Sequence, residues 1–543
     1  MTRFLNSYPL IISTLGPVHI GCGEDYEPTG YVMEDQVLHV FDPVEALRDN
    51  TRAREELSRL CDRPGAEVIQ KVQEFFFRRR EELIPFSTHC VTANEHFQKF
   101  YDERVMPERN KGKNNQLQIE RTAHVATEHR PILPGSSLKG AIRTALLNRE
   151  HGGKKLVNPR DAEKKKDWKE LAPLDQTLKH CLPQDFNLDP MRLIRVSDAN
   201  STTEWSGNDL RFAVNMKISG GTGKGPYQML ECLPPMEFEL FSCELSFLVT
   251  EERNRDKLPE IRWNFKDVAQ SCNQFYEPRL RTELNELQKF VHPSWRKNMI
   301  QSLEGGELRR LLDSGRAFLL RVGRHCGAES VTLDGVRHIK QPKTKTKPET
   351  WVDRPDTVWL AARDKAQMTH LLPFGWVLVE LNDSRRRPLA ETARELARLS
   401  EGSSENRKKR LADAEEKKKK LLEMRAEVRL QQEKEHQERE RLALEKENKE
   451  KSLQSLSPNR RQIAQFQELM EKTRILEPIS GNLWREVQVL VKKIEGERQE
   501  WLADEVAEFT GLCRDLLPGK IKGGDKKIKE LIQRLTTLQG EGT

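Results

Sequence analysis

The chain has 543 residues, of which 33% are charged, and a formal net charge of +7. This length is sufficient for two or three domains with hydrophobic cores, and the mild positive excess is compatible with a nucleic-acid partner without requiring one. No apolar run approaches the roughly 20 residues of a membrane-spanning helix, and YPLIISTLG lacks the cleavage site of a secretory signal, so we expect a cytoplasmic protein without membrane contact.

The nine cysteines are scattered along the chain and form no C-x-x-C pair. His124 and His129 are five residues apart and do not share a helical face, and the adjacent His325 and Cys326 have no second pair. We therefore predict no metal site, no cofactor and no disulfide framework, and we interpret the cysteines as reduced.

The first 398 residues interleave predicted strands with predicted helices. Helical periodicity covers about 43–80, 268–290 and 306–314, whereas about 85–130 has weak periodicity and is expected to form an excursion from the core. Apolar runs and clean alternation predict strands at YPLIISTL, GYVMEDQVLHVF, MRLIRVSDA, RFAVNMKIS, MEFELFSCELSFLVT, GRAFLLRVG and GWVLVEL. This interleaving favours an α+β fold over a helical bundle.

The segment RPILPGSSLKGAIRTALLNRE predicts a loop that leads into an amphipathic helix. Ser136 or Ser137 is the expected N-cap. The apolar residues that form one buried face are Leu138, Ala141, Ile142, Ala145 and Leu146. The first turn of a helix attracts anions, and Lys139 and Arg143 lie one turn apart on the flank of this face. The segment is therefore either an ordinary capped helix or a site for a phosphate backbone.

A glycine-rich stretch, KISGGTGKGPYQM, is similar to a phosphate-binding loop but does not satisfy its motif. Ile218 stands where the first glycine belongs, and Lys224 is followed by Gly225 where Ser or Thr is required. We predict a hairpin tip here, and the amides of Gly220 and Gly221 with the charge of Lys224 could still approach phosphates.

A second glycine element is LLRVGRHCGAESVTLDGVR. A predicted strand ends at Gly323, Gly327 follows, and Arg321, Arg324 and Arg337 lie close by in sequence. Basic residues at a strand-to-loop turn suit a polyanion, and a structural turn with incidental arginines is the alternative.

His19, in GPVHIGCG, is the one candidate for acid–base chemistry. A histidine titrates near neutrality and could deprotonate a ribose 2′-hydroxyl, although a structural role in the loop is more common. Asp25, just after this loop, is an equally isolated candidate.

Composition changes after the last predicted strand. From about 407 to 451, roughly 60% of residues are charged, against the usual quarter, and no heptad pattern is kept. We predict a highly charged, solvated helix or linker over 399–456. Amphipathic periodicity returns in 457–543, with breaks at ILEPISGN and LLPGKIKGGDKK, which predicts a small all-α module of about three helices.

Four stretches together resemble one family: TLGPVHIGCGEDYEPTGYV, ILPGSSLKGAIRTALL, LRVGRHCGAESVTLDG and LPFGWVLVEL. They are similar to the RAMP superfamily of CRISPR-associated proteins, and within it to the fifth Csm subunits of type III-A effector complexes. The resemblance covers most of 1–381 and does not reach 399–543. It implies tandem ferredoxin-like, RRM-like domains with helical insertions in the region 1–398.

The resemblance also implies a function. Such subunits are non-catalytic, contact the 3′ portion of the crRNA, cap the filament and stack on the neighbouring backbone subunit. They are required for crRNA 3′-end maturation by recruited nucleases, and their expected partners are the crRNA, the target RNA and the neighbouring Csm backbone and small subunits. The excursion at 85–130 would correspond to a thumb in the duplex of crRNA and target RNA. The residues that we expect to contact RNA are His19, Gly21, Gly135, Ser136, Ser137, Lys139, Arg143, Gly220, Gly221, Lys224, Arg321, Gly323, Arg324 and Gly327.

The chain departs from the pattern of target-cleaving backbone subunits, which carry an essential aspartate in a loop after the first strand. Here that region reads GCGEDYEP, and Asp25 does not align with it clearly. We therefore expect no catalytic residue. The alternative is a metal-independent endoribonuclease that uses His19, and a third interpretation is a scaffold whose 399–543 arm recruits a partner.

Overall fold

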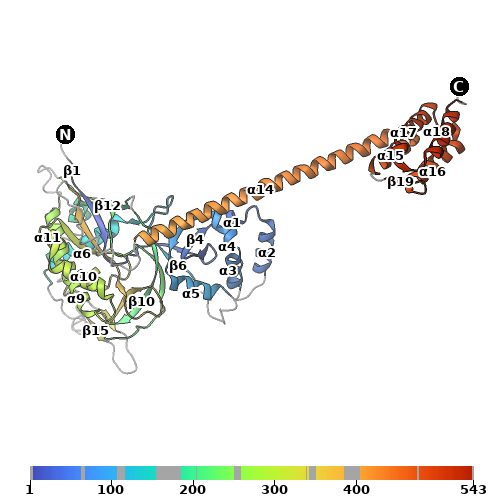
Figure 1. The fold of residues 1–543 in the computed structure, drawn as a ribbon. Coiled ribbons are helices and arrows are strands. Elements are labelled where there is room, and N and C mark those ends of the chain that lie inside the picture. Colours follow the sequence, from blue (N-terminus) through green and yellow to red (C-terminus); the bar gives the residue numbers. More distant parts are fainter. Residues whose placement is uncertain are drawn as a thin grey trace. The chain divides into compact units, whose positions relative to one another are not determined.

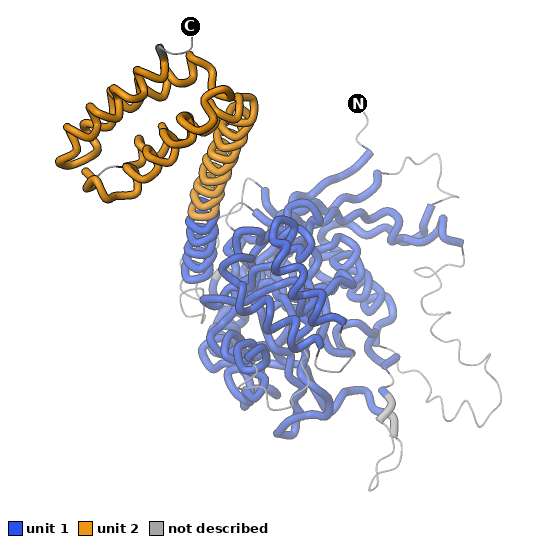
Figure 2. The backbone as a smooth tube through the Cα atoms, turned by 90° about the vertical axis from the view of Figure 1, so that its right-hand side faces the viewer, with its two compact units in different colours: residues 1–423 blue, residues 424–543 orange. Residues whose placement is uncertain are grey.

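The computed structural model divides the chain into two compact units, 1–423 and 424–543 (Figure 2). The residues that the structure describes are 4–62, 68–106, 117–153, 185–202, 205–249, 258–337, 339–341, 350–383, 404–473 and 476–540.

A seven-stranded sheet forms the first layer of unit 1 (Figure 1). Its strands are β1 (Leu5–Thr14), β7 (Ile132–Leu133), β8 (Ile194–Val196), β9 (Ala199–Ser201), β12 (Glu237–Leu248), β13 (Ala317–Arg321) and β18 (Trp376–Leu381). The order is β13-β18-β1-β12-β9-β7, with β8 also paired to β12, and every pair is antiparallel. The central strand β1 pairs with two strands that lie much later in the sequence, β12 and β18. Leu10 lies opposite Cys243 on one side and Leu381 on the other.

A second, nine-stranded sheet has the order β2-β6-β11-β10-β5-β4-β3, with β16 paired to β10 and β17 paired to β16. Its strands are β2 (Gly21–Tyr26), β3 (Tyr31–Glu34), β4 (Val37–Phe41), β5 (Ser87–Thr92), β6 (Ile119–Thr122), β10 (Asp209–Lys217), β11 (Gln228–Cys232), β16 (Thr357–Ala362) and β17 (Leu372–Pro373). A separate short hairpin pairs β14 (Ile339–Gln341) with β15 (Thr350–Val352). The predicted mixture of strands and helices is thus confirmed as a mixed α/β fold.

Helices of unit 1 cover these sheets. They are α1 (Pro43–Leu47), α2 (Thr51–Cys61), α3 (Val68–Arg78), α4 (Arg80–Leu83), α5 (Glu95–Val105), α6 (Gly135–His151), α9 (Phe265–Glu286), α10 (Pro293–Glu304), α11 (Gly306–Asp313) and α12 (Ala328–Val331). α6 and α9 pack on each other and reach β8 and β13 respectively. A single large cluster of buried apolar side chains runs between helices and sheets, with Ile12, Leu146 and Phe318 all fully buried within it.

The segment 85–130 differs from the expected excursion wherever the structure describes it. The rings of Phe97 in α5 and Phe212 in β10 stack with centroids 4.7 Å apart, and the Tyr31 hydroxyl donates to the carbonyl of Leu117. Aromatic side chains on α5 therefore draw this segment into the core, although their spacing gives little periodicity. The stretch NKGKNN lies outside the described residues.

The long charged helix α14 (Ser404–Ser455) begins against unit 1. Arg407 is buried, forms an ion pair with Glu237 and donates to the Ser206 hydroxyl. Lys418 donates to the carbonyl of Ser87, and the side chain of Leu411 lies so close to Gly207 that a Cβ at this glycine would meet it at 2.5 Å. The first turns are thus docked, unlike the fully solvated helix that we predicted, whereas 431–450 is exposed throughout.

Unit 2 holds four helices after the end of α14 among its described residues. They are α15 (Pro458–Lys472), α16 (Asn482–Gly496), α17 (Ala503–Leu516) and α18 (Asp525–Gly540). The two connections predicted as breaks carry β19 (Glu477–Pro478) and β20 (Ile521–Lys522), which pair in parallel. This pairing connects the loop between α15 and α16 with the loop between α17 and α18. The four helices enclose a hydrophobic core that includes Phe466, Trp484 and Phe509.

Candidate nucleic-acid interface

The helix α6 begins at Gly135, and its N-cap is Pro134, which has no side-chain cap to offer. The cap is supplied from the turn between β8 and β9, because the Gly135 N–H donates to the Oδ1 of Asp198 at 2.7 Å. A Cβ at Gly135 would lie 2.3 Å from the carbonyl oxygen of Val196, so only glycine fits this close approach. The expectation that Ser136 or Ser137 is the N-cap was wrong, because a carboxylate distant in sequence already occupies the first free amide.

The predicted buried face of α6 is confirmed. Leu138, Ile142, Ala145 and Leu146 are each at most 2% exposed, and Ala141 packs against the same core. The helix is therefore held rigidly along one side, and its opposite side carries the polar residues.

Three cations lie together near the start of α6. Partial burial lowers the pKa of the Lys139 ammonium, and the charges of Arg143 and Arg195 lower it further against the opposing effect of Asp189. Arg195 on β8 is exposed. None of the three cations forms an ion pair with a residue that the structure describes. We call Lys139, Arg143 and Arg195 the α6 cation cluster.

The stretch from 218 to 227 connects β10 and β11, which are antiparallel, so the predicted hairpin tip is confirmed. Gly220 and Gly221 have positive φ angles of 122° and 86°, and Lys224 is exposed. Asn215 donates to the carbonyl of Lys224 at 3.0 Å and holds the loop.

The loop that contains Gly323 and Gly327 packs against the GPVHIGCG loop that contains His19. The Arg324 N–H donates to the carbonyl of His19 at 2.8 Å. A Cβ at Gly323, whose φ is 84°, would lie 2.2 Å from that same carbonyl oxygen. The structure therefore brings the Gly323–Gly327 loop against the GPVHIGCG loop that holds His19, and Gly21 in the latter is exposed.

His19 itself is fully buried, which corrects both roles considered for it. Its Nδ1 lies 2.7 Å from the carbonyl of Glu231, and burial lowers the pKa of the imidazole, so the ring is neutral near pH 7. A side chain with no exposed surface neither contacts RNA nor exchanges a proton with it in this conformation. Asp25, by contrast, is partly exposed and accepts from Gln118 at 2.6 Å.

Arg321 is also buried, so the expected RNA contact is not available to it. Its guanidinium donates to Glu283 at 2.8 Å and to the carbonyl of Phe374 at 3.0 Å, because a buried cation needs such partners. Arg324 differs, since 41% of its side chain is exposed although it pairs with Glu120.

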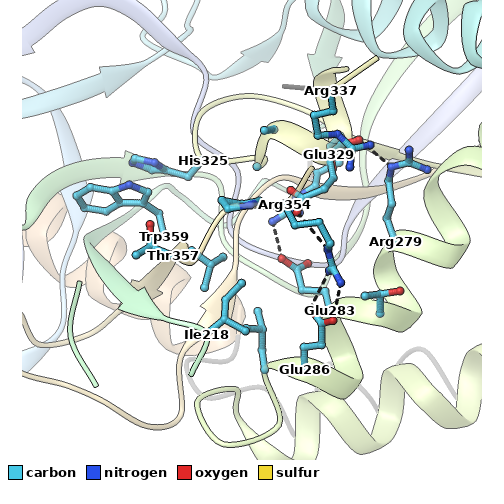
Figure 3. A pocket seen from close by; sticks show the side chains of 18 of the residues that line it. Ile218, Arg279, Glu283, Glu286, His325, Glu329, Arg337, Arg354, Thr357 and Trp359 are labelled. Carbon is cyan, nitrogen blue, oxygen red and sulfur yellow. Dashed lines mark hydrogen bonds and ion pairs between the residues drawn. The ribbon is translucent and has the colours of Figure 1, made fainter. Parts of the chain in front are cut away.

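A cavity of about 480 Å³ adjoins the Gly323–Gly327 loop (Figure 3). Its charged side chains are paired with one another, as Arg354 with Glu286 at 2.7 and 2.8 Å and Arg279 with Asp334 at 2.7 Å. The ring of Trp359 stacks on His325 with centroids 4.8 Å apart. Burial lowers the pKa of His325 to about 3, so this ring is neutral. With balanced charges and an aromatic wall, the cavity suits a neutral planar group better than a phosphate.

The predicted residues thus fall into two groups. One is the start of α6, and the other comprises the loops around Gly21, Gly323 and Gly327. The two groups are linked through α9, where the Tyr276 hydroxyl donates to the carbonyl of Ala141 and lies 3.4 Å from that of Ser330. No local sequence pattern pointed to Arg195 and Trp359, which lie on strands whose pairing partners are far along the chain.

In the part of the chain that the structure describes, no helix combines the length and apolar content of a membrane crossing. The family model of the RAMP superfamily matches residues 11–510. The chain is 22% identical over 348 residues to the CRISPR system Cms protein Csm5 of Methanocaldococcus jannaschii, a match that covers 56% of this chain and 69% of that protein. It is 28% identical over 150 residues to the Csm5 of Streptococcus thermophilus, a match that covers 27% of this chain and 40% of that relative.

Two solved structures are also similar. One is the cryo-EM structure of a Csm–crRNA–target RNA ternary complex of a type III-A CRISPR-Cas system, with 18% identity and a TM-score of 0.46, covering 69% of this chain and 100% of that one. The other is the crystal structure of T. onnurineus Csm5, with 18% identity and a TM-score of 0.40, covering 68% and 99% respectively.

Proposed function

Because the chain belongs to the RAMP superfamily, we propose that it is an RNA-binding, non-catalytic subunit of a type III-A CRISPR effector complex. Its partners in this proposal are the crRNA, the target RNA and the neighbouring Csm backbone and small subunits. The similarity to two proteins named Csm5 supports this assignment.

The observation that carries the proposal is the α6 cation cluster. Lys139, Arg143 and Arg195 form no ion pair with the described residues. Burial lowers the pKa of Lys139 most, the Asp189 charge opposes this, and the charges of Arg143 and Arg195 lower the pKa further. A phosphate placed between them would relieve this repulsion. Contacts of this kind read the backbone and not the bases, as a subunit must do if it accepts guides of any sequence.

The glycine loops supply a second contact region in this proposal. The exposed Gly21 and Arg324, the Gly327 backbone and the hairpin tip with Lys224 offer amides and cations to riboses and phosphates. The adjoining cavity with Trp359 and His325 would accept an unstacked base, since bases bind to aromatic surfaces irrespective of sequence.

An RRM-like unit is supported by the order of the seven-stranded sheet. The order β18-β1-β12-β8 has antiparallel neighbours, with α6 between β1 and β8 in the sequence and α9 between β12 and β18, which supports a β-α-β-β-α-β unit extended at its edge by β13. The nine-stranded sheet has a different strand order.

A ribonuclease that uses His19 is the less favoured function, because the imidazole is buried and neutral. Incubation of the purified chain with labelled RNA, with and without EDTA, distinguishes non-catalytic RNA binding from ribonuclease activity. Non-catalytic binding predicts intact RNA, whereas cleavage that His19→Ala abolishes would support the ribonuclease.

We further propose that the subunit caps the filament at the 3′ side of the crRNA and is required for maturation of that end by recruited nucleases. The test is to assemble the complex in cells with and without this chain and to sequence the crRNA 3′ ends. Loss of the mature end without the chain supports capping, and unchanged ends contradict it.

The helix α14 and the module 457–543 would serve as an arm for a further partner. Deletion of 424–543 tests whether assembly of the complex needs this arm.

A further inference from the structure

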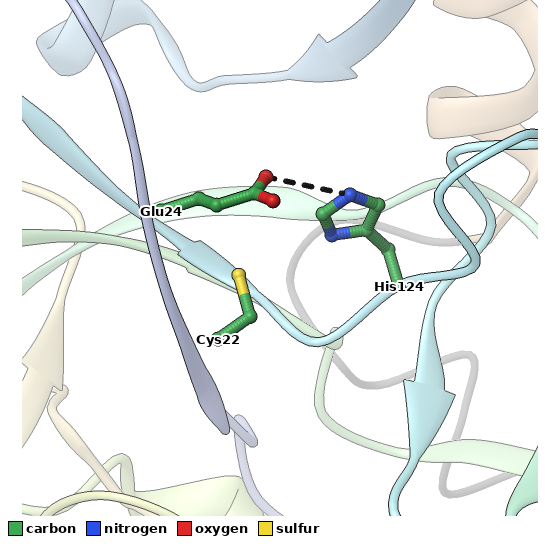
Figure 4. Close-up of side chains that lie close together, drawn as sticks. All are labelled: Cys22, Glu24 and His124. Atoms are coloured by element: carbon green, nitrogen blue, oxygen red, sulfur yellow. Dashed lines mark ion pairs between the residues drawn. The ribbon is translucent and has the colours of Figure 1, made fainter.

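The pairing of β2 with β6 gathers Cys22, Glu24 and His124 at one place on unit 1 (Figure 4). Gly21 lies opposite Thr122, and the register shifts between Gly21 and Asp25, so the two side chains from β2 face the start of the loop after β6. The thiol, a carboxylate oxygen and an imidazole nitrogen all lie within 4.8 Å of one another. Figure 4 shows the three side chains pointing toward a common space.

The imidazole of His124 is oriented for metal binding. Its Nδ1 lies 3.1 Å from the carbonyl of Thr122, so this nitrogen carries the proton and donates. In the neutral ring the other nitrogen, Nε2, then carries the lone pair, and it faces the Glu24 Oε2 at 3.7 Å. A hydrogen bond from the second ring nitrogen to a carbonyl is the arrangement that fixes the tautomer of metal-bound histidines.

Glu24 is held in place from the other side. The Arg121 guanidinium donates to its Oε2 at 2.8 Å and lies over the Tyr26 ring, 4.8 Å from its centroid. The Arg121 contact and the approach to His124 both involve Oε2, so the exposed carboxylate would turn to offer Oε1 to a metal ion. Carboxylates that bind a metal directly are typically hydrogen-bonded by a group in the outer shell, and Arg121 would have that place here.

We propose that Cys22, Glu24 and His124 bind a Zn²⁺ ion. Thiolate, imidazole and carboxylate together suit zinc, whereas magnesium and calcium take oxygen ligands and copper(I) prefers thiolates. Ligand atoms around tetrahedral zinc are about 3.5 Å apart, so the group must close slightly. Cys22 and Glu24 are exposed and can rotate to do this, and the fourth position would be open to water. His124 is far from Cys22 and Glu24 in the sequence, which is why residue spacing gave no metal signal.

The test uses the full-length, untagged chain, reduced, stripped with a chelator and dialysed against Zn²⁺ or Co²⁺. We expect about one equivalent of bound Zn²⁺ by elemental analysis. Loaded with Co²⁺, the protein should show a sulfur-to-cobalt charge-transfer band in the near ultraviolet. Both signals should be lost in Cys22→Ser, and the metal content should fall in Glu24→Gln. These exposed positions leave the core unchanged, and circular dichroism of the apo forms checks their fold.

Two matched variants make the result specific. Cys61→Ser removes another exposed thiol, and His129→Ala removes the ring that stacks 6.0 Å from His124. Both should keep the metal and the band. The proposal is overturned if the wild-type chain binds no metal after dialysis, or if Cys22→Ser keeps the charge-transfer band. Because the readouts are metal content and a spectrum, they do not depend on RNA binding.

Discussion

The backbone N–H of Gly135 donates to the Oδ1 of Asp198 at 2.7 Å, across the gap between the start of α6 and the turn after β8. The carboxylate occupies the position at a helix N-terminus where a phosphate would otherwise bind. It follows that RNA at this helix would be held by the side chains of the α6 cation cluster and not by the first amide.

Replacing Asp198 with Ala tests this division of roles. Loss of the cap should lower the free energy of unfolding by about 1 kcal/mol, as for other capping residues. Because the change also removes a negative charge from the start of the helix that carries Lys139 and Arg143, RNA affinity should rise. Urea denaturation and filter binding measure the two effects, and a variant that is destabilised and also binds RNA more weakly would contradict the account.

The contact between the Gly323–Gly327 loop and the loop that contains His19 can be tested at Gly323. A Cβ there would lie 2.2 Å from the His19 carbonyl oxygen, at a φ of 84°, so Gly323→Ala should cost at least about 2 kcal/mol of stability. Gly315 has a φ of 66° and nothing within 4 Å of its Cβ position, so Gly315→Ala should cost only about 1 kcal/mol. If the two variants lower the melting temperature equally, the Gly323 backbone does not pack against the His19 carbonyl.

The buried ion pair of Arg407 and Glu237 fixes the start of α14 on unit 1. Arg407→Met should cost about 3–5 kcal/mol, because it leaves the Glu237 carboxylate, whose pKa is already raised by burial, without its partner. Lys420→Met, which removes an exposed pair with Glu416 on the same helix, is the control and should leave stability unchanged. If urea denaturation gives the same free energy of unfolding for both variants, the docking of α14 does not depend on the buried pair.

Stability should depend on pH through buried histidines. Burial lowers the pKa of His39 to about 4 in the folded protein, whereas an unfolded histidine titrates near 6.5. The unfolded state therefore binds more protons between these values, and the free energy of unfolding falls as the pH decreases. For His39 alone the loss from pH 7 to pH 5 is about 2 kcal/mol. Denaturation of wild type and His39→Gln at both pH values checks this, since the variant should lose less by about that amount.

The sequence predicted best what depends on local spacing. The apolar repeat of α6 placed its buried face correctly, and the change in composition near 407 marked a long charged helix. The hairpin around Gly220 was also predictable, because glycines between two alternating runs have few other uses.

What the sequence did not reveal depends on contacts between distant segments. Asp198 caps α6 from 63 residues away, and Glu231 binds His19 from 212 residues away. The burial of His19 and Arg321 follows from the loops that close over them, which no local pattern encodes. The gathering of Cys22 with His124 has the same origin, since it arises only when β2 pairs with β6.

The central claim is that cations at the start of α6 hold an RNA backbone without reading its bases. The most direct measurement is the affinity of the purified chain for two single-stranded RNAs of unrelated sequence over a series of salt concentrations. Wild type should bind both alike, with the logarithm of affinity falling linearly against that of salt.

Lys139→Gln combined with Arg143→Gln should weaken binding of both RNAs and reduce that slope by about 1.4, because each phosphate contact on a single strand contributes about 0.7. The matched variant Lys434→Gln with Arg439→Gln, on the exposed part of α14, should bind as wild type does. An unchanged slope in the first variant, or affinities that differ strongly between the two RNAs, would contradict the claim.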